Sequence, residues 1–203
     1  MICVRYADDI VLGFQHESDA RRFWTAMCER LQEFSLALHT DKTRLITFDR
    51  YAAAQRAGRK LGKPETFNFR GFTFICNKSR QGKFLLHRKS RRDRIRAKLK
   101  EVKEELQQRR HQPIPEQGKW LRQLVGGFFV YHAVPTNSHA LAAFRQHVTD
   151  LWRRSLRRRS QKDRTTWERM ARLADAFLPR PRILHPLPSD RFAVKHAWQE
   201  PSA

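Results

Sequence analysis

The segment Ile-Cys-Val-Arg-Tyr-Ala-Asp-Asp-Ile-Val-Leu-Gly-Phe, residues 2–14, decides how the N-terminal part of this chain folds. Apolar residues alternate with other residues on both sides of Asp8-Asp9, which is the pattern of two strands joined by a short turn. We therefore predict a β-hairpin with two buried strands and two carboxylates at its tip. Next to the aromatic Tyr6, such a pair can hold Mg²⁺ against phosphate groups. An Asp pair is also common in turns that bind no metal.

Outward from the hairpin, hydrophobic periodicity predicts further α and β elements. Ser18 can cap a helix whose apolar residues recur every three or four positions as far as Phe34, so one face of this helix should pack on the hairpin. The rest of this half is predicted to contain strands at 44–48 and 67–75, a basic loop at 52–64, and a turn at Gln81-Gly82 that leads into a strand from Phe84.

The C-terminal half has helical periodicity. A helix from Arg88 carries the narrow apolar stripe Ile95, Leu99, Val102 and Leu106, and Pro113 and Pro115 end it. Three more helices are predicted at 120–131, at 138–160 and after Thr165 or Thr166, with Trp120, Trp152 and Trp167 on their apolar faces as core residues. The Pro-rich stretch 179–188 should be extended. The predicted fold class is α+β, in which sheet hairpins with a packed helix precede a basic helical bundle.

The charge of the chain points to a polyanionic partner. Among 203 residues, 42 are Lys or Arg and 20 are Asp or Glu, which gives a net charge of +22. A protein with this surplus of positive charge binds phosphates, and the binding releases their counterions. We therefore expect nucleic acid as the partner first, and an anionic membrane surface second. No apolar run is long enough to span a membrane, and there is no secretory leader pattern. Cys3, Cys28 and Cys76 show no metal or disulfide spacing.

Several motifs follow one another in the order found in one polymerase family. Tyr6-Ala7-Asp8-Asp9, then Leu36-Ala37-Leu38-His39 with Asp41-Lys42-Thr43, then the stretch 67–74, resemble consecutive palm motifs of a group II intron reverse transcriptase. The stretches 120–132 and 137–162 resemble the maturase-specific thumb region of that family. The resemblance implies the C-terminal part of the palm at 1–86, a basic connecting helix and linker at 87–115, a thumb or maturase domain at 116–178, and a Pro-rich basic tail at 179–203.

The resemblance also assigns roles near an active site. It implies that Asp8 and Asp9 are catalytic and bind Mg²⁺, and that Tyr6, Lys42, Gly71 and Phe72 lie close to primer or nucleotide. Lys42 also fits a solvated turn lysine beside Asp41. The Phe residues around Gly71 fit core packing better than contact with a ligand, which leaves Gly71 the better functional candidate. Only five residues precede Tyr6, and the family's upstream catalytic Asp has no counterpart here, so we expect no autonomous polymerase activity.

Arginines of the helical half are the candidate RNA contacts. Arg forms bidentate bonds to phosphate and stacks on bases, and acidic residues are scarce here. A solvated charged face is the simpler alternative. The predicted RNA-binding residues are Arg91, Arg92, Arg94, Arg153, Arg154, Arg157, Arg158, Arg159, Lys162 and Arg164. Arg96, Lys98 and Lys100 surround the apolar stripe of the helix from Arg88 in the same way.

The resemblance implies a maturase that binds group II intron RNA and assists its splicing in a cytoplasmic, bacterial-type ribonucleoprotein. In the intact family protein the partners include a primer–template duplex, and Mg²⁺ acts only in a complete palm. One alternative is a polymerase completed by a separate N-terminal chain, and another is a non-functional mobile-element fragment. We expect no membrane as a partner, because no apolar run is long enough to span one. We also expect no zinc, because no Cys/His cluster has ligand spacing.

Overall fold

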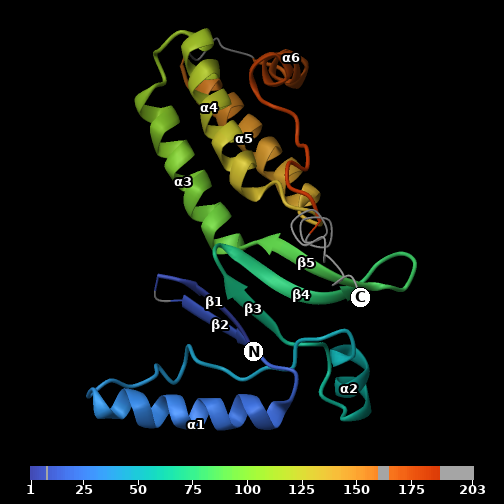
Figure 1. The fold of residues 1–203 in the computed structure, drawn as a ribbon. Helices are drawn as coiled ribbons and strands as arrows, with labels where there is room; N and C mark the ends of the chain where they lie inside the picture. The colour runs from blue at the N-terminus through green and yellow to red at the C-terminus, as the bar shows by residue number, and fades with distance from the viewer. Residues whose placement is uncertain (8, 160–164, 188–203) are drawn as a thin grey trace, which may run out of the picture. The chain divides into compact units, whose positions relative to one another are not determined.

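The computed structural model describes residues 1–7, 9–159 and 165–187 (Figure 1). The described residues form six helices and two small antiparallel sheets, which confirms the predicted mixed α+β class. The chain divides into two compact units, Met1–Arg70 (unit 1) and Gly71–Ala203 (unit 2). This division falls at the turn Arg70-Gly71, whereas the sequence placed its boundaries after residue 86 and near residue 115.

Unit 1 begins with the predicted hairpin, formed by β1 (Ile2–Tyr6) and β2 (Asp9–Gly13). The strands are antiparallel, with Tyr6 opposite Asp9 and Ile2 opposite Gly13. The prediction that both strands are buried was wrong. All five residues of β1 are exposed, and Ile2 is 71% accessible. A two-residue alternation places apolar side chains on one face of a strand, but it does not supply a layer to cover that face.

Helix α1 (Glu17–Glu33) starts one residue before the predicted cap. His16 takes the N-cap position without a side-chain hydrogen bond, and Ser18 lies inside the first turn. Glu17 and Asp19 place carboxylates in that turn, where they stabilise the helix dipole, and Glu17 also pairs with Arg21 at 2.6 Å. On the apolar side the rings of Phe14 and Phe23 lie 5.4 Å apart.

Two predictions in the middle of unit 1 were wrong. Residues 44–48 form no strand. Their contacts are made by side chains, since Arg44 donates to the Thr66 carbonyl at 3.1 Å and Phe48 packs edge-on against Phe67. The predicted loop at 52–64 contains helix α2 (Ala52–Gly58), because a run of alanines favours a helix. The unit ends with β3 (Thr66–Phe69).

Unit 2 begins with the hairpin of β4 (Phe72–Lys78) and β5 (Phe84–Ser90). Its register runs from Phe72 opposite Ser90 to Lys78 opposite Phe84. The Gln81-Gly82 turn is confirmed, with Gly82 at φ +77°. The predicted start of the next helix at Arg88 was wrong, because β5 continues to Ser90 and α3 (Arg92–Gln108) follows it.

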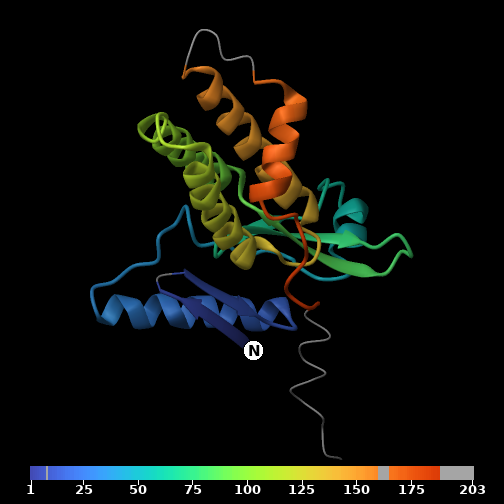
Figure 2. The same ribbon diagram turned by 90° about the horizontal axis from the view of Figure 1, so that it is seen from above.

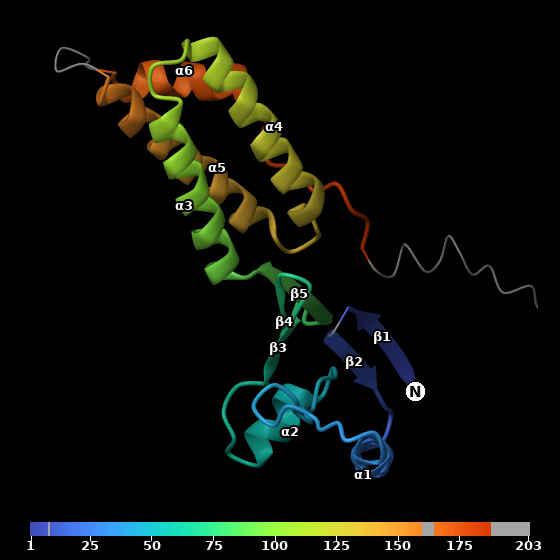
Figure 3. The same ribbon diagram turned by 90° about the vertical axis from the view of Figure 1, so that its left-hand side faces the viewer.

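The remainder of unit 2 is the predicted helical bundle. Helices α4 (Ile114–His132) and α5 (Ser138–Arg157) run alongside α3, and α6 (Trp167–Phe177) crosses α4 and α5 (Figures 2 and 3). The residues with no more than 2% exposure that join these helices include Val102, Leu106, Leu121, Val125, Leu141, Phe144, Val148, Trp152, Leu156, Met170 and Ala174. The crossing of α4 and α6 requires Gly118, because a Cβ atom there would overlap the Phe177 ring.

The N-cap residues of two bundle helices differ in whether their side chains form a capping hydrogen bond. Thr166 caps α6 as predicted, since its hydroxyl accepts from the Arg169 amide at 3.3 Å. Asn137 takes the N-cap position of α5, yet its side chain makes no capping bond.

Of the three tryptophans predicted to be core, Trp152 is fully buried and Trp120 is half-buried, but Trp167 is 47% exposed. No helix in the described ranges has the length and apolarity needed to cross a membrane.

Candidate nucleic-acid interface

The hairpin tip in unit 1 holds the predicted metal ligands, but the structure describes only part of it. Asp8 lies outside the described residues, and Asp9 is exposed at the start of β2. Ala7 takes φ +50° in the turn, and the Arg70 guanidinium lies 4.6 Å from the centre of the Tyr6 ring. Among the residues that are described, no three His, Cys, Asp or Glu side chains are grouped as metal ligands. Mg²⁺ binding by this tip therefore stays a prediction.

The other residues predicted near primer or nucleotide have different environments. Lys42 is exposed in a turn closed by hydrogen bonds from the Lys42 and Thr43 amides to the His39 carbonyl. Gly71 adopts φ +74°, in the region that favours glycine, and its carbonyl accepts from the Arg91 amide at 3.0 Å. Phe72 is 7% exposed and is packed within unit 2, so its ring serves the core.

Among the candidate arginines of α5, the structure separates exposed side chains from a packed one. Arg154, Arg157 and Arg158 are exposed, and Arg154 pairs with Asp150 at 2.7 Å. Arg153 is half-buried, with its guanidinium 4.0 Å from the centre of the Trp167 ring. RNA binding by Arg153 stays a prediction, made for a side chain that is already packed on one side. The same cation–π contact explains why a tryptophan on an apolar stripe remains partly exposed. Lys162 and Arg164 lie outside the described residues.

Arg159 was predicted to bind RNA and instead holds the α3–α4 connection. Its guanidinium donates to the carbonyls of Arg110 and Gln112. Two neighbours act on the same turn, since the Gln117 amide donates to the Arg109 carbonyl at 2.6 Å and the Ser155 hydroxyl donates to the Leu106 carbonyl at 3.0 Å. These bonds give donors to carbonyl groups in the last turn of α3 and in the connection that follows it. Charge alone does not distinguish a phosphate contact from a contact with backbone carbonyls, and RNA binding by Arg159 stays a prediction.

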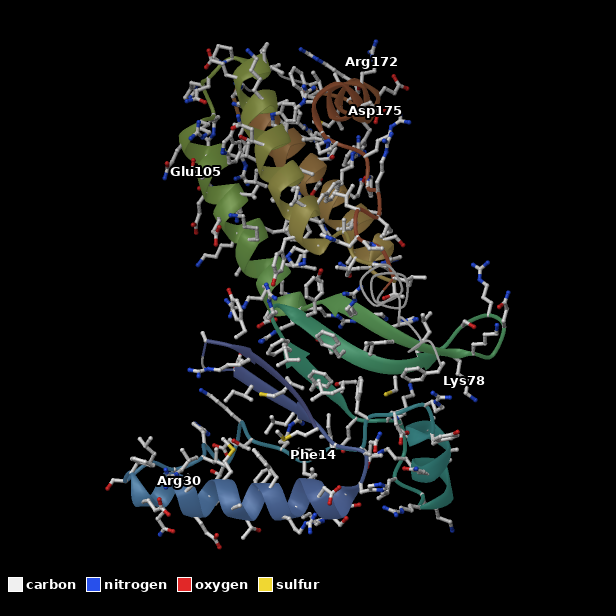
Figure 4. All side chains as sticks on the ribbon, in the orientation of Figure 1. Phe14, Arg30, Lys78, Glu105, Arg172 and Asp175 are labelled. Carbon is white, nitrogen blue, oxygen red and sulfur yellow. The ribbon has the colours of Figure 1, made fainter. Side chains whose placement is uncertain are left out.

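Arginine is also used internally on α5 at Arg145. Its guanidinium donates to the Ala174 carbonyl at 3.0 Å and pairs at 2.8 Å with Asp175, which Figure 4 labels on α6. Because the Arg145 side chain is only 18% exposed, it joins two helices. Arg154, Arg157 and Arg158 of the same helix are exposed instead.

Helix α3 carries a row of exposed cations that extends beyond the predicted residues. Four of them are separated by four, four and three positions, so they share one face of the helix. We call them the α3 stripe, which consists of Arg92, Arg96, Lys100 and Lys103. Of the predicted α3 contacts, Arg92 belongs to this stripe and Arg94 is exposed on another side. Arg91 is paired with Asp93 at 2.5 Å, and its hydrogen bond lowers the pKa of that carboxyl.

The acidic residues of α3 are mostly paired away from the stripe. Glu101 binds Lys98 at 2.8 Å, and Glu105 binds Arg109 at 3.0 Å. Within the described part of the chain, the one ion pair of the stripe joins Lys100 to Glu104 at 3.9 Å. The stripe is therefore a row of positive charge with little internal compensation.

A groove of about 500 Å³ lies between α3 and α4. Its lining includes Arg94 and Lys98 from α3 and Gln123, Gly127, Tyr131 and His132 from α4. Tyr131 is 44% exposed and stacks on Phe72 with ring centres 5.6 Å apart. The sequence predicts a helix at 120–131 but not this groove, since the spacing within each helix does not show which residues of a neighbouring helix complete a site.

A buried polar network lies beneath the groove and was also missed. The Asn137 side chain accepts from the Ser90 amide at 3.0 Å and donates to the Ser90 hydroxyl and the His132 carbonyl, each at 2.8 Å. The Ser90 oxygen lies 2.8 Å from His132 Nδ1. Burial lowers the pKa of His132 to about 4, so the ring is neutral near pH 7. The hydrogen bond between the Ser90 hydroxyl and Nδ1 joins the ring to the end of β5.

No family model matches the chain, and no curated protein matches it. The assignment to a reverse transcriptase and maturase therefore rests on the motifs alone.

Proposed function

We propose that this chain is the palm and thumb portion of a group II intron reverse transcriptase and maturase, and that unit 2 binds structured intron RNA. The observation that carries the proposal is the α3 stripe, with four exposed cations on one helix face. The exposed arginines of α5, Arg154, Arg157 and Arg158, add to the positive charge of the bundle. The order of the sequence motifs supports the choice of family.

The arrangement of charge on α3 favours a polyanionic ligand over a merely solvated face. Like charges three or four positions apart destabilise a helix by about 0.2 to 0.5 kcal/mol per pair. Arg92 and Arg96, and then Arg96 and Lys100, stand at the four-residue separation. In a helix selected only for solvation, we would expect Glu residues among these cations, as Glu101 is paired with Lys98 on α3. Phosphates bound along the stripe would remove this repulsion and release counterions.

RNA binding by itself suffices for a maturase function. A protein that binds the folded, splicing-competent form of an RNA more tightly than other forms shifts the RNA population toward that form. The transesterification chemistry then belongs to the RNA, and the protein needs no proton-transfer groups for it. This role requires cations that track the sugar–phosphate backbone and further contacts that recognise one RNA shape.

The test compares the salt dependence of RNA affinity for two variants with equal charge loss. Replacing Arg92, Arg96, Lys100 and Lys103 with Gln should weaken binding of a structured group II intron RNA and reduce the salt slope by up to about four units, at roughly 0.9 per lost phosphate contact. The control replaces four exposed cations of unit 1 with Gln, namely Arg50, Arg59, Lys60 and Lys63. Equal slopes for the two variants would contradict the role of the stripe.

Competition separates the family assignment from general attraction between opposite charges. An excess of an unrelated structured RNA of equal length should fail to displace the intron RNA near physiological salt, because specific complexes are typically bound at least about a thousandfold more tightly than non-specific ones. Equal displacement by both RNAs would exclude the maturase assignment while leaving unit 2 an RNA-binding bundle.

A further inference from the structure

We infer that the groove between α3 and α4 binds one unpaired nucleotide of the RNA, with its base against Tyr131 and its phosphate at Arg94. The inference rests on the proposed function, since it assumes that RNA is the ligand of unit 2. It goes beyond that function by assigning a base-binding site separate from the phosphate-binding stripe.

The groove is open to solvent and has the volume for a single nucleotide. Its volume of about 500 Å³ lies in the range of pockets that bind small ligands, roughly 300 to 1,000 Å³. Glycine at position 127 keeps one wall open, because a Cβ atom built there would meet nothing within 4 Å. Single-stranded bases, unlike those in a duplex, can leave the helical stack to enter such a site.

Tyr131 offers a rigid aromatic surface for the base. Its ring is 44% exposed, packs against Phe72 on one side, and meets His132 edge-on with ring centres 4.9 Å apart. Phe72 is itself 7% exposed, so the tyrosine ring is backed by the core of unit 2. An aromatic side chain held in place loses little conformational freedom when a base stacks on it.

Polar groups of the lining suit the edge of a base and its phosphate. His132 is neutral near pH 7, and the Gln123 amide supplies both a donor and an acceptor. On the α3 wall, Arg94 is exposed, while the Lys98 ammonium is held by Glu101 at 2.8 Å. Arg94 is therefore the principal phosphate partner, and an anionic group would compete with Glu101 for Lys98.

Two adjacent glycines provide a matched pair of variants. Gly126 and Gly127 both have open space around a built Cβ atom, but Gly126 lines a different cleft of about 570 Å³ beside α6. Gly127→Leu fills the α3–α4 groove, and Gly126→Leu fills the other cleft. Each replacement raises helix propensity, so both proteins should stay folded, which thermal melting checks. Tyr131→Leu is a third variant that removes the stacking surface.

The probe is an RNA hairpin with one unpaired 2-aminopurine, compared with the fully paired hairpin. Wild type and Gly126→Leu should bind the bulged RNA about tenfold more tightly than the paired RNA and change the 2-aminopurine fluorescence, in line with the usual strength of base–aromatic stacking. Gly127→Leu and Tyr131→Leu should bind both RNAs equally, with no fluorescence change and an unaltered salt slope.

The outcomes distinguish the base site from the proposed function. Tight, salt-dependent binding by wild type without a bulge preference or fluorescence change would overturn the base site and leave RNA binding intact. A preference that survives Gly127→Leu or is lost equally in Gly126→Leu would also overturn it. Failure of wild type to bind either hairpin or the structured intron RNA would overturn the proposed function and this inference with it.

Discussion

At the scale of single residues, His132 shows how packing sets the protonation state of a histidine that belongs to no sequence motif. The ring stacks on Phe128 with centres 4.1 Å apart, and its Nδ1 is bound to the Ser90 hydroxyl. Burial of the ring, and no neighbouring charge, lowers its pKa from 6.5 to about 4. The folded protein therefore keeps His132 neutral over a range in which the unfolded chain protonates it.

This difference predicts a pH dependence of stability. Between pH 6.5 and about 4 the unfolded chain binds one more proton at His132 than the folded chain, so the free energy of unfolding falls as pH falls through that window. Above pH 6.5 the contribution of the neutral ring is fully present. We predict that His132→Gln reduces the loss of stability between about pH 7 and about pH 5, measured by urea denaturation at each pH. Identical losses in variant and wild type would contradict the assignment.

The arginines and tryptophans show how far the burial of a side chain can be predicted from residue type and spacing. Residue type and helical spacing correctly predicted that Trp152 is core and that Arg154, Arg157 and Arg158 lie outside it. The same reasoning was wrong for Trp167, which is 47% exposed, and did not predict the contacts of Arg159 with backbone carbonyls. A guanidinium binds carbonyl groups and aromatic faces as readily as phosphate, and only the arrangement of neighbouring helices decides among them. The base-binding residues proposed for α4 were missed for the same reason.

At the scale of elements, the connection between α3 and α4 depends on a buried glutamine. Gln117 is fully buried, donates to the Arg109 carbonyl at 2.6 Å and accepts from Trp152 Nε1 at 2.8 Å. This one side chain therefore links the end of α3, the start of α4 and the middle of α5. Its polar atoms are satisfied inside the core, and their partners depend on them in turn.

Replacing Gln117 should be costly even with a residue of similar shape. Gln117→Met leaves the Trp152 indole N–H without its acceptor, whereas the Arg109 carbonyl keeps the Gln112 amide as a donor at 3.0 Å. We predict a loss of about 1 to 3 kcal/mol in unfolding free energy, the usual cost of one buried unpaired group. The exposed Gln107→Met on α3 is the control and should change stability by less than about 0.5 kcal/mol. Chemical denaturation measures both, and similar values for the two variants would contradict the role of Gln117.

The elements predicted best are the helices whose apolar faces pack into a shared core. Four helices in unit 2 follow from apolar residues at three- and four-residue spacing, because burial of that face is what stabilises them. The segment 44–48 was predicted as a strand from residue types alone, but a strand also needs a neighbouring backbone to pair with, which the sequence of the segment cannot specify. The extension of β5 to Ser90 likewise depends on Asn137, which lies 47 residues away.

At the scale of the whole molecule, the two units differ in how much apolar surface they bury. Among the residues that the structure describes, 16 of the buried hydrophobic ones lie in unit 2 and three, Ala20, Ala52 and Phe69, lie in unit 1. The stability of a unit comes mainly from such burial, at about 25 cal/mol per Å² of apolar area. The division of cores was not predicted, because the alternating apolar residues of the N-terminal hairpin indicate a buried face without indicating what would cover it.

The unequal cores predict that the two units open independently and at different cost. Amide hydrogen exchange on the full-length chain should show the slowest exchange in the buried turns of α3, α4 and α5, approaching the rate set by global unfolding. Amides of β1 and α1 should exchange faster, because their helix and hairpin are held by few buried side chains, with Ala20 the one buried residue of α1. Structured RNA should slow exchange further in α3 and α5 while leaving α1 unchanged, since the proposed contacts belong to unit 2. Equal protection of α1 and α5 in the free protein would show that the units unfold together, and RNA-dependent protection confined to α1 would place the RNA-binding surface outside the bundle.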